Sequence, residues 1–346
     1  MDKKDEIILQ QLETIRTMTE RNLRSMGGDF WGTPFENVTG APEKKPASKD
    51  GGGKPAAAQP AEKKAGEPEP LPKENLADLQ AELDSYIGLA DVKEEVKNLI
   101  NMVNVYKLRR AHDLPTTDMS LHMVFTGNPG TGKTMMARMM ARIYRSLDIL
   151  SKGQLVEVDR SGLVAGYVGQ TALKTQKVIE KAMGGVLFID EAYALNGKSE
   201  NDFGQEAIDT ILKAMEDHRD DLVVIVAGYT DLMEKFIHSN PGLESRFNRF
   251  LLFEDYSPDE MLAIFRMQCK KGCYQLAEGT EELVRDYINE ENGDPETFGN
   301  ARGVRNCFEH ILVAQNNRLA AMESVTKDDL MTIIPDDVLY ARGKLD

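Results

Sequence analysis

The sequence has few cysteines and fewer basic than acidic residues. Its 346 residues include three cysteines, and 42 lysines and arginines stand against 57 aspartates and glutamates, giving a formal net charge of −15. So few cysteines exclude a disulfide framework and favour a reducing compartment. Cys269 and Cys273 are spaced like a metal-binding pair, but no second cysteine or histidine pair lies nearby, so ordinary helix thiols are expected. The acidic balance argues against a large nucleic-acid footprint.

Long hydrophobic runs are also missing. No apolar stretch reaches the ~18 residues of a membrane span. The N-terminus mixes acids with its lysines and has no sustained apolar core, so it does not resemble a signal peptide. A cytoplasmic protein is therefore expected. With 41% hydrophobic residues the chain can still bury a core, and its length suits about two domains.

The first 73 residues differ from the remainder. Residues 4–26 place apolar side chains on one helical face, and an aromatic segment around Trp31 completes a predicted N-terminal unit, 1–40. Residues 41–73 hold seven of the 14 prolines and one large apolar residue, which predicts a disordered linker. The tethered helix is expected either to dock a protein partner or to pack on the main domain.

The following segment alternates between strand and helix patterns. Strands are predicted over 121–125, 154–158, 186–189, 222–226 and 250–253. Helices are predicted over 75–86, 91–112, 135–147, 171–183, 205–218 and 231–238. This alternation is typical of a parallel sheet with helices on both faces, and we expect one α/β domain over 74–256.

The strand signal disappears from Ser257 onward. Helices are predicted over 258–269, 280–289, 301–322 and 336–344. These residues are expected to form a separate helical domain, 257–346.

One glycine-rich turn, GNPGTGKT at 127–134, joins a predicted strand to a predicted helix. Its backbone N–H groups and the helix N-terminus favour phosphate binding. Lys133 can reach the β- and γ-phosphates, and the Thr134 hydroxyl can ligate Mg²⁺. The turn residues expected to contact the nucleotide are Asn128, Pro129, Gly130, Thr131, Gly132, Lys133 and Thr134.

Two carboxylates follow the buried strand at 186–189. Asp190 is placed to hold Mg²⁺ beside the phosphate-binding turn. Glu191 can orient a water for attack on the γ-phosphate. Together with the turn they predict nucleotide hydrolysis.

Two arginines can stabilise the charge of phosphoryl transfer. Arg246 stands just before the fifth strand, and Arg302 begins a helix of the C-terminal domain. A guanidinium fork suits γ-phosphate oxygens, although a single arginine is more often a surface residue.

The order of these motifs resembles an AAA+ ATPase, and more narrowly the CbxX/CfqX family, with its stage V sporulation protein K group and red-type Rubisco activases. The motifs are GNPGTGKT, FIDEA, PGLESRF and GNARGVRN, and the resemblance covers about residues 76–345. It implies a P-loop NTPase with a parallel five-stranded sheet and a C-terminal helical lid. It also implies ATP and Mg²⁺ as cofactors, and a homohexamer.

The resemblance further implies roles for individual residues. Residues 127–134 correspond to the Walker A motif, and Asp190 and Glu191 to Walker B. Arg246 corresponds to the arginine finger, which acts on the neighbouring subunit's ATP. Arg302 corresponds to sensor 2, which acts within its own subunit.

The resemblance also implies a turn that contacts the adenine base and a sensor 1 residue that contacts the attacking water. Ile87 and Gly88 match the turn that packs on adenine. Sensor 1 falls within 227–230, where Thr230 is chosen because its hydroxyl can hold the attacking water. Tyr229 is the alternative.

The motif at 166–169 places Tyr167 and Val168 between two glycines. Such a loop is mobile and has an apolar tip, and six tips around a channel could grip a polypeptide without reading its sequence. The resemblance implies this pore-loop role. The alternative is a turn whose tyrosine packs on the domain.

These features favour a hexameric protein-remodelling motor acting on a client protein. A nucleotide-dependent switch or scaffold, recruited through its N-terminal helix, is one alternative. A nucleic-acid motor is another, but the net acidity and the uncharged loop argue against it.

Overall fold

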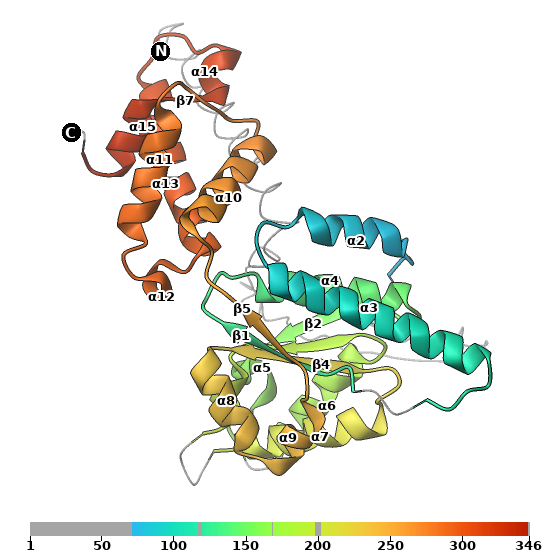
Figure 1. The fold of residues 1–346 in the computed structure, drawn as a ribbon. Coiled ribbons are helices and arrows are strands. Elements are labelled where there is room, and N and C mark those ends of the chain that lie inside the picture. Colours follow the sequence, from blue (N-terminus) through green and yellow to red (C-terminus); the bar gives the residue numbers. More distant parts are fainter. Residues whose placement is uncertain (1–70, 117–119, 168, 198–201, 345–346) are drawn as a thin grey trace, which may run out of the picture.

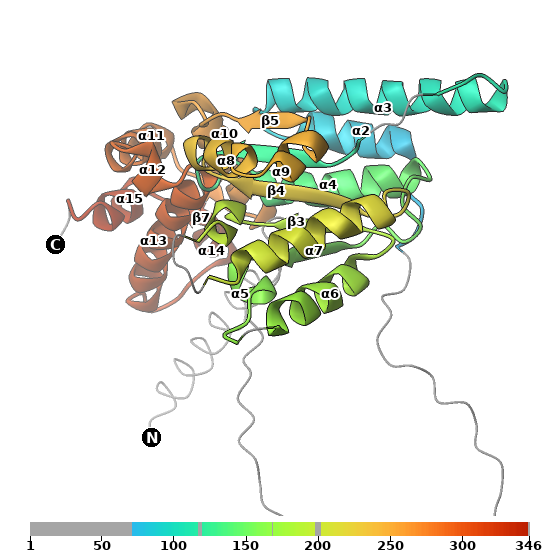
Figure 2. The same ribbon diagram turned by 90° about the horizontal axis from the view of Figure 1, so that it is seen from below.

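The computed structural model describes residues 71–116, 120–167, 169–197 and 202–344 (Figure 1). The predicted N-terminal unit, most of the predicted linker and Val168 lie outside these residues. The described chain comprises a sheet domain and a helical domain, which lies to one side of the sheet in both views (Figures 1 and 2).

A parallel five-stranded sheet with the order β2-β3-β4-β1-β5 forms the centre of the first domain. The strands are β1 (Met123–Gly127), β2 (Leu155–Val158), β3 (Val186–Ile189), β4 (Val223–Gly228) and β5 (Phe250–Phe253). Every residue of β3 and β4 is buried, as expected of central strands covered on both faces. All five predicted strands are confirmed, β3 and β5 with their predicted bounds.

Helices cover both faces of this sheet. One face carries α2 (Leu76–Ser85), α3 (Ala90–Ala111) and α4 (Lys133–Ser146). The other carries α5 (Arg160–Leu163), α6 (Gln170–Ala182), the 3-10 helix η1 (Ala192–Leu195), α7 (Gly204–Asp217), α8 (Thr230–His238) and α9 (Pro241–Arg246). Neighbouring strand residues divide between the two cores, with Phe125 in the first and Val124 in the second.

The C-terminal domain has its own core, in which Phe265 and Phe308 meet edge to face at 5.4 Å. Its helices are α10 (Pro258–Lys271), α11 (Thr280–Glu291), α12 (Pro295–Phe298), α13 (Ala301–Ala320), α14 (Lys327–Met331) and α15 (Pro335–Ala341). Ser257 and Glu260 form a capping box at the start of α10, which explains the abrupt change at residue 257.

The C-terminal domain is helical, as the sequence predicts, but it also contains one short pair of strands. β6 (Gln275–Leu276) and β7 (Thr332–Ile333) pair in parallel. Two residues per strand are too few to produce an alternating pattern, so the sequence gives no periodic signal there.

None of the described helices is both long and apolar enough to cross a bilayer.

Candidate nucleotide-binding site

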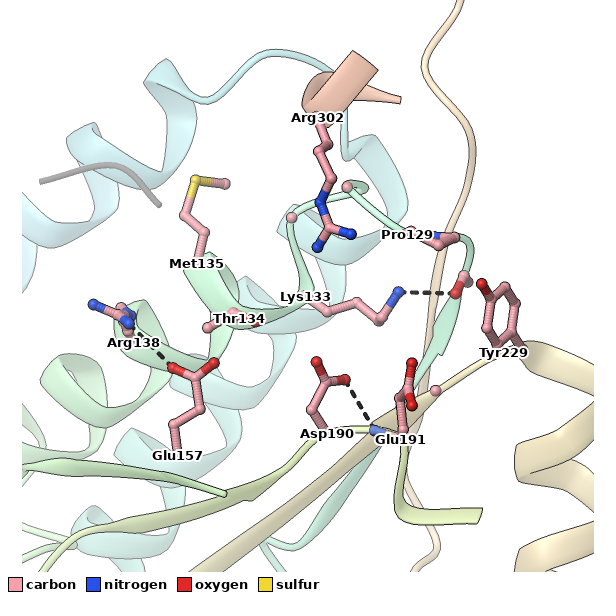
Figure 3. A pocket seen from close by; sticks show the side chains of 14 residues that line it. Pro129, Lys133, Thr134, Met135, Arg138, Glu157, Asp190, Glu191, Tyr229 and Arg302 are labelled. Atoms are coloured by element: carbon pink, nitrogen blue, oxygen red, sulfur yellow. Dashed lines mark hydrogen bonds and ion pairs between the residues drawn. The ribbon is translucent and has the colours of Figure 1, made fainter. Parts of the chain in front are cut away.

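A cavity of about 290 Å³ lies at the carboxyl edge of the sheet, where the phosphate-binding turn, the ends of β3 and β4, and the start of α13 converge (Figure 3). The carboxyl ends of parallel strands meet at one edge, and ligands of open α/β sheets bind there. The fold thus brings Lys133, Asp190 and Arg302 into one cavity.

The phosphate-binding turn, hereafter the P-loop, connects β1 to α4. Gly127 has φ +143°, and a Cβ there would lie 2.2 Å from the carbonyl oxygen of Phe253 on β5. Glycine is therefore required where the loop leaves the sheet. The buried hydroxyl of Thr131 donates to the carbonyl of Asn128 at 2.8 Å, which fixes the middle of the loop.

The Lys133 ammonium points back along the P-loop. Its Nζ donates to the carbonyl oxygens of Gly127 at 2.8 Å and Asn128 at 2.7 Å (Figure 3). Burial lowers the pKa of Lys133 to about 8, and the nearby Asp190 carboxylate offsets part of this shift. A phosphate in the cavity would supply the missing countercharge.

Asp190 and Glu191 follow β3, and both line the cavity. Figure 3 shows both carboxylates directed toward the P-loop. The Glu191 N–H donates to Asp190 Oδ1 at 3.0 Å, and Glu191 has φ +47°, a left-handed conformation that is rare outside glycine. Such strain often accompanies functional residues.

The residues present fit Mg²⁺. Thr134 and Asp190 line the same cavity, and one hydroxyl plus one carboxylate, completed by phosphates and waters, is the donor set expected for Mg²⁺ in an ATPase. Among the described residues there is no cluster of three histidine, cysteine or acidic side chains that could hold a metal unaided.

The two candidate arginines are placed differently. Arg302 extends from the first turn of α13 into the cavity (Figure 3). Arg246 ends α9, forms an ion pair with Glu216, and accepts a bond from the Ser120 hydroxyl at its carbonyl, at 2.8 Å. Ser120 precedes β1 and Gly127 ends it, a span of roughly 20 Å of extended chain. Arg246 is thus remote from the cavity of its own chain.

Of the two candidates for sensor 1, Tyr229 lines the cavity. Thr230 is exposed at the start of α8 and is not among the lining residues. Ile87 and Gly88 do not line the cavity either. Ile87 packs against the core of the C-terminal domain, and Gly88 lies against Glu260 of α10, so both lie at the junction of the two domains.

Three lining residues had no predicted role: Met135, Arg138 and Glu157. Arg138 Nη2 donates to Glu157 Oε2 at 3.1 Å (Figure 3). Arg138 lies one turn after Thr134, and Glu157 is the exposed member of an otherwise half-buried strand. Both positions could have been found from the helical and strand periods.

The loop at 164–169 is anchored at its base and exposed at Tyr167. The Ala165 N–H donates to the buried Thr171 hydroxyl at 3.0 Å, and Lys174 Nζ donates to the carbonyl of Val164 at 3.0 Å. Tyr167 is 74% exposed. The alternative in which this tyrosine packs on the domain does not describe this structure.

The chain matches two family models. Residues 123–255 match the ATPase family associated with various cellular activities (AAA), and residues 257–345 match the AAA lid domain. A solved RuvB mutant of Thermotoga maritima shares the fold, with a TM-score of 0.50 and 17% identity, over 75% of this chain and 71% of that chain.

Curated relatives are much more similar in sequence. The chloroplastic ribulose bisphosphate carboxylase/oxygenase activase of Cyanidioschyzon merolae is 44% identical, over 78% of this chain and 92% of its own. Plasmid protein CbxX of Cupriavidus necator is 42% identical, over 83% and 92%. Stage V sporulation protein K of Bacillus subtilis is 40% identical, over 76% and 82%. The chain therefore belongs to the AAA ATPase family, in the group of the CbxX and CfxQ proteins, and is an enzyme that hydrolyses ATP.

Proposed function

We propose that this ATPase is a cytoplasmic protein-remodelling motor. In this proposal six copies form a ring, and ATP hydrolysis drives the Tyr167 loops to pull a client polypeptide through the centre. The observation that carries the proposal is an aromatic side chain, 74% exposed, at the tip of a loop whose base is bonded to α6. An exposed tyrosine on a loop with a hydrogen-bonded base can make apolar contacts with a polypeptide.

The position of Arg246 supports a ring. Its backbone carbonyl is bonded to Ser120 before β1, its guanidinium pairs with Glu216 of α7, and it does not line the cavity of its own chain. An arginine that serves phosphoryl transfer from there must act on the ATP of a neighbouring subunit. Cyclic assembly of identical subunits gives every cavity such a neighbour.

The residues of the cavity divide the chemistry between them. Lys133 and Arg302 neutralise charge that develops on the γ-phosphate, and Glu191 orients the attacking water. Tyr229 is assigned to sensor 1 in place of Thr230, because Tyr229 faces the cavity. Thr134 and Asp190 would hold Mg²⁺, which when bound supplies positive charge at the phosphates.

The loop chemistry favours a polypeptide over a nucleic acid. A channel for nucleic acid needs lysine or arginine for the phosphates. None of the four residues 166–169 carries a charge. The grip is therefore expected to act on polypeptide without reading a specific sequence.

A trapping experiment tests this function. Glu191→Gln is expected to bind ATP without hydrolysing it, and so to retain its client in a native extract. Capture of a specific protein should be lost when Tyr167→Ala is added, and kept with Tyr340→Ala, which truncates another exposed tyrosine.

Other outcomes would contradict the motor. A captured protein that is lost only on removal of residues 1–36 would favour a scaffold recruited through the N-terminal helix. Captured nucleic acid would favour the nucleic-acid motor. Either result would leave the assignment of ATP hydrolysis unchanged.

A further inference from the structure

A polar cluster joins the P-loop to the C-terminal domain. Its centre is Asn300, which is fully buried and immediately precedes α13. The Asn300 Nδ2 donates to Asp255 Oδ1 at 2.7 Å and to the carbonyl of Pro129 at 3.3 Å. Its Oδ1 accepts from the N–H of Tyr256 at 2.9 Å. Both ends of this amide are thus satisfied, by partners from two separate segments, the P-loop and residues 255–256.

The P-loop takes part in three more hydrogen bonds of the cluster. Asn128 Nδ2 donates to both carboxylate oxygens of Asp255, at 3.1 and 2.9 Å. The N–H of Ala301 donates to the carbonyl of Gly130 at 3.3 Å. Three consecutive P-loop residues, 128–130, are therefore each bonded to the C-terminal domain or to the segment that leads into it.

The contact is close and strained. A Cβ at Gly130 would lie 2.1 Å from the carbonyl oxygen of Gly299. Asn300 has φ +55° and ψ −126°, outside the regions that non-glycine residues favour. A strained residue persists where its surroundings over-determine it, and here the surroundings are the bonds just described.

The side chains of Asn128, Asp255 and Asn300 connect the P-loop to the start of the C-terminal domain, and these two parts would have to move together. Asp255 lies between β5 and α10, in the segment where the two domains join. Arg302, which reaches into the cavity, lies two residues after Asn300. The phosphates are expected to bind the backbone N–H groups of the same loop whose carbonyls face Asn300 and Ala301. A change in the geometry of the P-loop would therefore shift the start of α13.

We propose that Asn128, Asp255 and Asn300 form a clasp of positioning residues that sets the angle of the helical lid according to the state of the P-loop. The clasp places Arg302 over the cavity when phosphates are bound, and it carries the movement of the loop to the lid. The proposal depends on ATP binding alone, so it stands or falls separately from the ring and the client.

An exchange of amide and carboxylate tests the clasp. N300D places two carboxylates together, and D255N removes the charge that accepts from both asparagines. Each single variant is expected to raise the KM for ATP about tenfold, the effect of losing a hydrogen bond to a charged group. The double variant D255N/N300D restores a donor and an acceptor between positions 255 and 300, but it leaves the Pro129 carbonyl without its donor. Its KM should therefore fall below that of either single variant without reaching the unaltered value. E254Q, which changes the neighbouring exposed carboxylate, is the control.

A distance measured between the two domains separates a change in lid angle from a simple loss of protein stability. Spin labels on the exposed Cys273 of the lid and on Lys181→Cys at the end of α6 report the lid angle, since Cys269 and Cys307 are buried. ADP is expected to shift the distance in the unaltered sequence and in D255N/N300D. The single variants should show a broad distribution that ADP shifts little.

Two results would overturn the clasp. One is a normal ADP-dependent shift in both single variants. The other is a KM for the double variant that is no lower than that of either single variant. If N300D does not fold, the D255N variant alone tests the clasp, because Asp255 is exposed and belongs to none of the hydrophobic cores.

Discussion

At the scale of single residues, the charge of Lys133 has the most direct consequence. Burial lowers its pKa from 10.5 to about 8 in the site without nucleotide. Phosphate oxygens favour the charged ammonium, so ATP binding raises this pKa and takes up a proton. Binding is therefore strongest below pH 8 and weakens as pH rises above it, by up to about tenfold per pH unit until the pKa of the complex is reached.

Calorimetric titration with ATP between pH 7 and 9.5 checks this prediction. Proton uptake above pH 8 should appear as a dependence of the measured enthalpy on the buffer. Lys133→Arg is the control, because a guanidinium stays charged throughout this range and its affinity should not follow the same curve. Equal pH profiles for the two proteins would contradict the assignment.

At the scale of elements, the hydrogen bond that holds the base of the 164–169 loop can be tested without changing Tyr167. Thr171 is fully buried and accepts from the Ala165 N–H at 3.0 Å. Thr171→Val keeps the shape but leaves that N–H without an acceptor, which should cost about 1–3 kcal/mol locally. We expect faster amide exchange at Ala165, weaker client remodelling, and ATP hydrolysis close to that of the unaltered protein.

Thr210→Val is the matched control, since the Thr210 hydroxyl bonds within its own helix, to the carbonyl of Glu206 at 2.7 Å. Exchange at Ala165 should be unchanged in that variant. If Thr171→Val leaves exchange at Ala165 unchanged, the loop is not held in the way described.

Sequence patterns predict elements well where the physical signal is local. The continuous apolar runs of β3 and β5 give their bounds, and the capping box at Ser257 marks the start of the lid. The carboxylates Asp190 and Glu191 were predictable because they end a buried strand. β6 and β7 were not predictable, because two residues carry no period.

Sequence patterns do not predict the contacts between segments that are far apart in the chain. Asn300 and Asp255 lie 45 residues apart, and Asn128 lies a further 127 residues from Asp255. Nothing local indicates that they meet, since their contact depends on how the lid docks against the P-loop. The choice between Tyr229 and Thr230 was open for a similar reason, because it depends on the residue at which β4 gives way to α8.

At the scale of the whole molecule, the proposed ring completes each catalytic site with an arginine of the neighbouring subunit. Arg246 is remote from its own cavity, whereas Lys133 and Glu191 line it. Arg246→Ala should therefore bind ATP normally and lose roughly 10³-fold in hydrolysis, the usual effect of removing an arginine finger. Lys133→Ala should lose ATP binding.

The most direct measurement is the ATPase rate of these two variants mixed in equal amounts. Random rings place an intact cavity beside an intact Arg246 at about one quarter of their interfaces, so about a quarter of the unaltered activity should return. A mixture of Lys133→Ala with Glu191→Gln should stay inactive, because both defects lie in the same subunit's cavity. Recovery in the first mixture alone would support the shared site. A mixture of Arg246→Ala and Lys133→Ala that forms rings but stays as inactive as its components would contradict it.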